Sequence, residues 1–99
     1  MNAQAANALY EAERKGVRQT KVLQDYRGGL CARGVLMSAA DALHSYDYDR
    51  MIKVFELRPR IACPDCGKED CETMIISHLN DTHDRTFSEI ARKLGPDHA

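Results

Sequence analysis

The sequence predicts a small, mainly α-helical domain of about four to five short helices. Three observations lead to this prediction. Apolar residues recur at three- and four-residue spacings in several short segments, as on one face of a helix. Glycines and prolines separate these segments, and cysteines and histidines gather in the last 40 residues, at Cys63, Cys66, Cys71, His78 and His83. At 99 residues, the chain is near the lower size limit at which one apolar core is sufficient for folding.

The composition is that of an ordinary globular protein. Hydrophobic residues make up 43% and charged residues 29% of the chain, and no apolar run approaches the roughly 18 residues that cross a bilayer. The opening segment, Met1-Asn-Ala-Gln-Ala-Ala, has neither the basic leader nor the apolar stretch of a secretory signal. We therefore expect a cytoplasmic protein without membrane contact, whose cysteines stay reduced and serve in metal binding, redox chemistry or burial.

Charge is distributed unevenly along the chain. Residues 1–59 carry nine Lys and Arg against seven Asp and Glu, whereas residues 60–99 carry five against eight. The net charge is −1 and the sequence pI is about 6.4. Proteins that follow the phosphates of nucleic acids are usually strongly basic, so the overall charge does not favour that function.

The first helix is predicted from Ala3 to Lys15, where good helix formers are followed by Gly16 as a stop. The next segment, 17–26, could form a second helix. Residues three and four apart are neighbours on a helix, so such a helix would bring basic side chains onto one stripe. This stripe is either an ordinary solvated face or a nucleic-acid-binding surface made by Arg14, Arg18, Lys21 and Arg27.

A further helix is predicted after Gly28-Gly29, running to about Leu43 with Cys31 buried on its apolar face. Gly34 lies inside it, where glycine costs about 1 kcal/mol relative to alanine, so we expect another backbone to approach closely there. Residues 49–57 fit a short helix slightly better than a strand, and the pattern leaves both open. Pro59 ends that element.

The segment Cys63-Pro64-Asp65-Cys66-Gly67 is followed by His78 and His83, a spacing of C-x2-C-x11-H-x4-H. Zinc takes four nitrogen or sulfur ligands in a tetrahedron; two cysteines can supply two of them from one turn, and a helix can supply two histidines. Proline and glycine suit that turn, since glycine tolerates the positive φ angle that it requires. The sequence therefore predicts a structural zinc site with these two cysteines and two histidines as ligands.

The two histidines place a condition on the intervening helix, which Thr73 could cap. Residues five apart lie about 140° apart around an ideal helix. His83 can therefore reach the metal bound by His78 only if the helix changes beyond Leu79, and Asn80-Asp81 favour an ending there.

Two alternatives remain for the cysteines. Cys71 could replace His83, giving a site with three cysteines and one histidine, which is equally good zinc chemistry. Cys63 and Cys66 could instead form a redox pair, although such pairs usually open a helix in a βαβ unit, which is not evident here.

The last helix is predicted after Thr86, because Thr86 and Glu89 have the spacing of a capping box. Ile90, Ala91 and Leu94 would face the core, and Gly95-Pro96 would end the helix.

The motifs Cys63-Pro-Asp-Cys66, Ile75-Ile-Ser-His78-Leu-Asn-Asp-Thr-His83 and Phe87-Ser-Glu-Ile-Ala91 together resemble small uncharacterised proteins of bacteriophages and actinobacteria. Gly29-Leu-Cys31-Ala-Arg-Gly34-Val-Leu36 is similar to a helix of the same proteins, so the resemblance covers roughly residues 28–94. It implies a compact helical fold and a phage origin, and it implies no activity. The cysteine and histidine motif also resembles a zinc finger, but Gly67-Lys-Glu-Asp-Cys71-Glu72 lacks the aromatic core residue of a DNA-reading finger.

These observations predict a helical N-terminal part, 1–59, and a zinc knuckle with two helices, 60–95, packed together as one domain. Because four protein ligands leave no open position on the metal, we expect a non-enzymatic regulator or adaptor that binds another protein. The alternative is a nucleic-acid-binding regulator that uses the basic stripe. An enzyme would need three ligands, a metal-bound water and a base such as Glu72 or Asp81.

Overall fold

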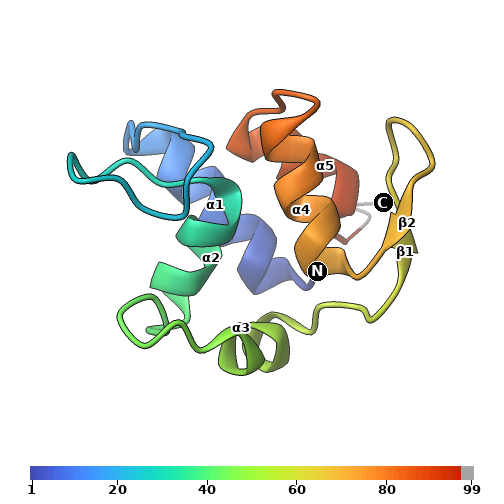
Figure 1. Cartoon of the computed structure of the whole chain (residues 1–99), viewed down its shortest axis with the longest axis horizontal. Coiled ribbons are helices and arrows are strands. Elements are labelled where there is room, and N and C mark those ends of the chain that lie inside the picture. The colour runs from blue at the N-terminus through green and yellow to red at the C-terminus, as the bar shows by residue number, and fades with distance from the viewer. Residues whose placement is uncertain (97–99) are drawn as a thin grey trace.

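The computed structural model describes residues 1–96 and shows the mainly helical fold that the sequence predicts. Five helices surround one core, and a small antiparallel hairpin projects at one side (Figure 1). The sequence pattern did not indicate the hairpin, which pairs Ile61 with Asp70 and Ala62 with Glu69. In chain order the elements are α1 (Ala3–Arg14), α2 (Ala32–Ala39), α3 (Tyr48–Phe55), β1 (Ile61–Ala62), β2 (Glu69–Asp70), α4 (Glu72–Asp81) and α5 (Phe87–Leu94).

The core draws its side chains from both halves of the chain. Helix α1 packs against α5 and α2, and α2 in turn packs against α4. The helices from the two ends of the chain therefore lie side by side (Figure 1). No helix within residues 1–96 is both long and apolar enough to cross a membrane. The largest fully buried side chains are those of Leu9, Leu36, Met37, Met51, Glu72, Ile75, Ile76, Leu79, Phe87 and Ile90.

Local signals fix the ends of α1 and of α5. The Asn2 side chain accepts a hydrogen bond from the backbone N–H of Ala5, and Gly16, with φ +76°, ends α1 where the sequence predicts. At α5, the Thr86 and Glu89 side chains each accept a hydrogen bond from the other residue's backbone N–H, which confirms the predicted capping box. The two helices that pack together at the centre of the fold thus begin and end at signals within their own segments.

The second helix considered for residues 17–26 does not form. The segment is a loop that doubles back, so that Thr20 N–H donates to the Leu30 carbonyl and Leu30 N–H donates to the Arg18 carbonyl. Cys31 N–H donates to the Val22 carbonyl in the same way. The backbone groups that a helix would pair locally are paired instead with residues 30 and 31, where the loop returns to α2. This pairing satisfies them without a helix.

The contact predicted at Gly34 is present. A Cβ atom on Gly34 would lie 2.0 Å from the carbonyl oxygen of Leu23, so the loop backbone occupies the space that any side chain would need. Helix α2 is shorter than predicted, because Asp41, with φ +55°, turns the chain after Ala39. Cys31 is buried as predicted, and its sulfur also caps α2 by accepting from Gly34 N–H.

Residues 48–55 form a helix, α3, and not a strand. The Asp47 side chain accepts a hydrogen bond from Arg50 N–H at its start. Glu56 adopts a left-handed conformation, with φ +52°, at its end. Met51 and Phe55, four residues apart and therefore on one face of the helix, are buried in the core. The opposite face of α3 is turned to solvent.

Candidate metal centre

Cys63 and Cys66 lie in the turn that joins β1 to β2. Cys63 N–H donates to the Lys68 carbonyl at 2.7 Å, and Gly67 N–H donates to the Cys63 carbonyl at 2.8 Å. Gly67 has φ +81°, the positive angle predicted for the knuckle. Pairing of β1 with β2 closes the base of this turn, so both thiols are presented from a short, hydrogen-bonded segment.

His78 lies near the end of α4. This helix begins two residues earlier than the Thr73 cap would place it, with Cys71 at the N-cap position and no side-chain cap bond there. Thr73 is buried within the first turn. The predicted cap is therefore wrong. Glu72 N–H, at the start of the helix, donates instead to the carbonyl of Arg58.

The ending of α4 brings His83 back toward His78. The His78 carbonyl accepts from both Thr82 N–H at 2.9 Å and His83 N–H at 3.3 Å, so the last turn widens. The helix ends at Asp81, and Asp84 then takes a left-handed φ of +52°. This is the change beyond Leu79 that two histidines five residues apart require for reaching one point.

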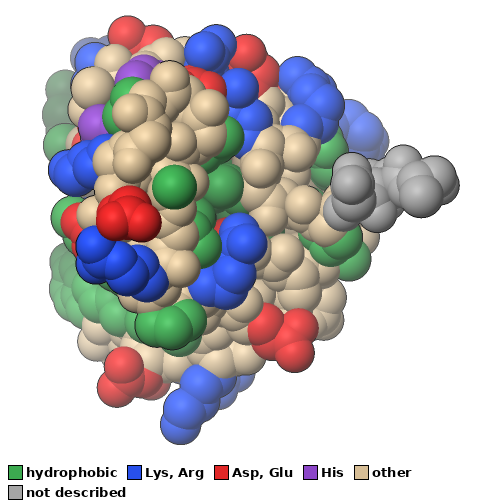
Figure 2. Space-filling model, turned by 90° about the vertical axis from the view of Figure 1, so that its right-hand side faces the viewer, with side chains coloured by type: hydrophobic (Ala, Val, Ile, Leu, Met, Phe, Trp, Pro, Cys, Tyr) green, Lys and Arg blue, Asp and Glu red, His purple; other side chains and the backbone are tan. Residues whose placement is uncertain are grey.

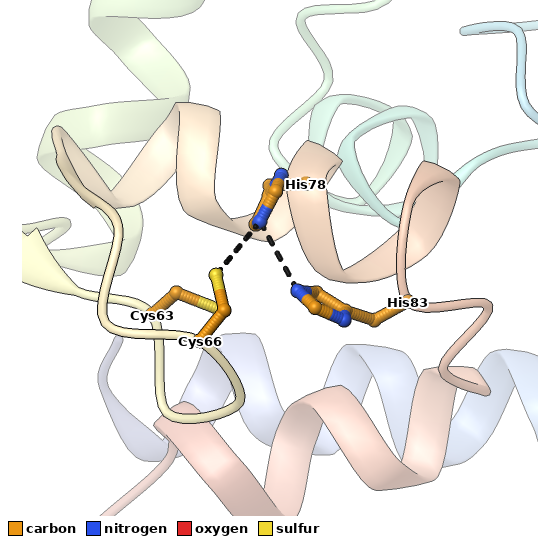
Figure 3. Close-up of side chains that lie close together, drawn as sticks. All are labelled: Cys63, Cys66, His78 and His83. Carbon is orange, nitrogen blue, oxygen red and sulfur yellow. Dashed lines mark hydrogen bonds between the residues drawn. The ribbon is translucent and has the colours of Figure 1, made fainter.

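The four side chains Cys63, Cys66, His78 and His83 point toward one centre (Figure 3). One ligand atom from each lies within 4.8 Å of all the others. The Cys66 sulfur is 3.2 Å from Nε2 of His78, which is 3.1 Å from Nε2 of His83. Bond lengths of about 2.0–2.3 Å in a tetrahedron separate ligand atoms by about 3.3–3.8 Å, so small adjustments suffice to hold one metal ion.

The rings of the two histidines are held edge to face, with centroids 4.7 Å apart and planes at 88°. Cys63 is buried, Cys66 is exposed and both histidines are half-buried. One side of the group therefore faces the core and the other faces solvent. An ion can enter from that solvent side, while the buried side fixes the positions of its ligands.

Cys71, the alternative ligand, is not part of this group. It lies at the N-terminus of α4, with side chains of α2, α3 and α4 around a shallow hollow. Its separation from the centre follows from the hairpin, because β2 stands between the knuckle and Cys71. Glu72, considered as a base, is also outside the group. Its carboxylate is fully buried, where it accepts hydrogen bonds from Arg58 and pairs with the amino group of Met1.

An aspartate inside the knuckle was not singled out by the sequence pattern. The Asp65 carboxylate lies 2.6 Å from Nε of Arg85 and 2.8 Å from Nζ of Lys93. Hydrogen bonds from Lys93 and Arg85, in that order of importance, lower the pKa of Asp65 to about 2. The knuckle is thereby attached to the segment after His83 and to α5. Nothing in the local sequence indicates this contact, because its partners are 20 and 28 residues away.

Asn80 is a second residue whose role only the structure shows. Its side-chain oxygen accepts from Gln19 Nε2 at 2.8 Å and from Ala32 N–H at 2.9 Å. Its Nδ2 donates to the Thr20 carbonyl and to Asp81, at 2.8 and 2.7 Å. A buried amide with all these partners holds the 17–31 loop against the end of α4, two residues from His78.

The basic residues predicted as a stripe do not share a helix face. Arg14 is paired with Glu11, Arg18 with Asp25 at 2.6 Å and Lys21 with Asp84 at 3.1 Å. Arg27 lies instead over the ring of Tyr26, 5.5 Å from its centroid. These contacts leave no continuous run of unpaired cations in this part of the structure.

No family model, curated protein or solved structure matches the chain. The resemblance to bacteriophage and actinobacterial proteins therefore rests on short motifs alone.

Proposed function

We propose that the cluster binds one structural zinc ion and that the chain is a non-enzymatic module that binds another protein as a regulator or adaptor. The observation that carries the metal assignment is the convergence of two sulfur and two nitrogen atoms within 4.8 Å. Two thiolates balance the charge of a divalent ion, and thiolate with imidazole suits zinc better than magnesium or calcium.

A structural role is favoured over a catalytic one by the number of ligands. Four side chains complete a tetrahedron and leave no position for a water or substrate. The cluster also joins the hairpin to the end of α4, at a point where the ion pair of Asp65 with Arg85 holds the hairpin to the segment after His83. Zinc binding at such a site contributes directly to folding, with apparent free energies of about 10–16 kcal/mol at neutral pH.

Charge favours a protein partner over a nucleic acid. On the face that carries the hairpin, acidic and basic side chains are interspersed (Figure 2). Near the predicted basic stripe, Glu11, Asp25 and Asp84 neutralise three of the four cations. A nucleic-acid-binding surface would present its cations free for phosphates.

Two experiments test this proposal. Metal analysis and cobalt substitution of the purified protein should give one ion per chain and the absorption spectrum of a tetrahedral site with two sulfur ligands. Affinity capture from the native host, followed by mass spectrometry and by binding of the purified candidate, should identify one protein that binds directly. A gel-shift titration that shows salt-sensitive binding to DNA or RNA, without a protein partner, would contradict the proposal.

A further inference from the structure

The loop between α1 and α2 displays large side chains to solvent. Tyr26 is 91% exposed and Val22 is 52% exposed, and both lie in the segment 20–29, here named the display loop. Arg27 stands over the Tyr26 ring at 5.5 Å. Two large side chains exposed within five residues of one loop mark this segment as a candidate interaction site.

Hydrogen bonds hold the display loop in one conformation. The Asp25 carboxylate accepts from Arg27 N–H at 3.0 Å and from Gly29 N–H at 2.7 Å, and it pairs with Arg18 at 2.6 Å. The backbone carbonyl of Leu23 lies against Gly34, in the first turn of α2. Since the backbone is already ordered, a partner that binds Tyr26 would pay little conformational entropy to fix it.

The base of the display loop is attached to the segment that carries the histidines. Gln19 donates to the Asn80 side chain at 2.8 Å and to the Arg85 carbonyl at 2.6 Å. Lys21 pairs with Asp84, the residue after His83. The metal centre therefore supports the same segment that positions the loop.

We propose that the display loop is the surface through which this chain binds its protein partner, and that it recognises a segment with an apolar or aromatic side chain next to a carboxylate. The inference rests on the protein-binding function proposed above. Tyr26 offers a large amphipathic ring with few rotatable bonds, and tyrosine and arginine are enriched among the residues that dominate binding energies. Val22 is a second exposed apolar side chain in the same loop.

The charge of the loop specifies the carboxylate. Within residues 1–96, no carboxylate lies within 4.0 Å of the Arg27 guanidinium, whereas Arg18 and Lys21 each have one. Arg27 is thus the free cation of this loop, and its planar fork binds carboxylates in two-point geometry. One unpaired cation beside an aromatic ring fits an acidic and apolar peptide better than a run of phosphates.

The test is a selection from a random peptide library displayed on phage, carried out against the metal-loaded full chain. Enriched peptides should combine an acidic residue with a neighbouring apolar or aromatic residue. Their affinity, measured by fluorescence polarisation, should fall by about tenfold or more in Tyr26→Asn and in Arg27→Glu, as expected for central contact residues. The matched control is Tyr46→Asn, because Tyr46 is also largely exposed, at 67%, but lies in the α2–α3 connection.

Two kinds of result overturn the inference. Enriched peptides whose affinity is unchanged in both Tyr26→Asn and Arg27→Glu would show protein binding at another surface, and the proposed function would stand. Failure to enrich any peptide, or binding of a single-stranded oligonucleotide that Tyr26→Asn abolishes, would overturn the assignment of this loop to a protein. Circular dichroism of each variant checks that the fold and the metal are retained.

Discussion

Nε of Arg85 lies 2.6 Å from Oδ2 of Asp65, although the two residues belong to different segments of the candidate metal centre. Asp65 lies between the two cysteines of the knuckle, and Arg85 follows His83 by two residues. Their ion pair therefore joins the segment that carries the thiols to the segment that carries the second imidazole. With Lys93 as a second cation on the same carboxylate, the positions of the two segments are fixed by contacts other than the ligands themselves.

We expect Asp65→Asn to weaken zinc binding about tenfold without changing its stoichiometry, because the ligands stay in place and their support is lost. A competition titration with a chromophoric chelator measures this affinity. The control is Glu69→Gln, which removes the exposed pair with Arg60 from the same hairpin and should leave the affinity unchanged. Equal effects of the two substitutions would show that the Asp65 contact does not support the centre.

Loss of a proposed ligand should unfold much of the domain. Cys66→Ser, His78→Ala or an excess of chelator should each abolish the cooperative thermal transition seen by circular dichroism. The reason is that the free energy of a structural zinc site, about 10–16 kcal/mol, is as large as the whole stability of a small domain, about 5–15 kcal/mol. Retention of a cooperative transition after complete removal of the metal would contradict the structural role.

Cys71→Ser distinguishes the two possible ligand sets. Because Cys71 lies outside the cluster, the variant should bind one zinc ion per chain with the affinity of the unchanged protein. Its cobalt spectrum should show the same sulfur-to-metal absorption. A weaker charge-transfer band would instead assign a third thiolate to the metal.

Gly34→Ala should destabilise the protein by about 1–3 kcal/mol, as overpacking does. The sign is informative, since glycine to alanine inside a helix ordinarily stabilises by about 1 kcal/mol. Here the added Cβ would lie 2.0 Å from the Leu23 carbonyl oxygen, which belongs to backbone and cannot rotate away. Chemical denaturation measures the change, and Ser38→Ala on the exposed face of α2 is the control. A stabilising effect would mean that the loop is not seated on the helix.

Glu72→Gln should cost about 3–5 kcal/mol at pH 7, the range for a broken buried ion pair, because Glu72 and the amino group of Met1 are both fully buried and Arg58 is a second, half-exposed partner. Burial alone would raise the pKa of Glu72. Hydrogen bonds from Arg58 and from the amino group of Met1 outweigh it and leave the pKa below its ordinary value.

That direction fixes the pH dependence. The stabilisation from Glu72 is complete above the ordinary glutamate pKa, about 4.3, and is lost as the pH falls through the lower pKa of the folded protein. The difference in unfolding free energy between the unchanged protein and Glu72→Gln should therefore shrink on acidification. Taking the difference cancels the acid sensitivity of the metal site, which both proteins share. A constant difference down to pH 3 would show that the carboxylate charge does not contribute.

The sequence alone determined the elements whose signals are local. Gly16 and the capping box of Thr86 and Glu89 lie within a few residues of the helix ends that they set, so their effect does not depend on distant contacts. The grouping of Cys63 and Cys66 with the two histidines was also visible, since metal coordination permits few spacings. The sequence also predicted the close approach of another backbone at Gly34, because glycine destabilises a helix and is expected there only where a side chain would not fit.

Tertiary structure decided what depends on partners far along the chain. The sequence allowed a helix over residues 17–26, but their backbone pairs with Leu30 and Cys31, and their loop is held by Asn80, about 60 positions away. The separation of Cys71 from the centre depends on the pairing of β1 with β2. Each of these strands has two residues, which is too few to show the alternating pattern by which a strand is recognised in a sequence. Local propensities amount to tenths of a kcal/mol per residue, and a buried, fully hydrogen-bonded contact outweighs them.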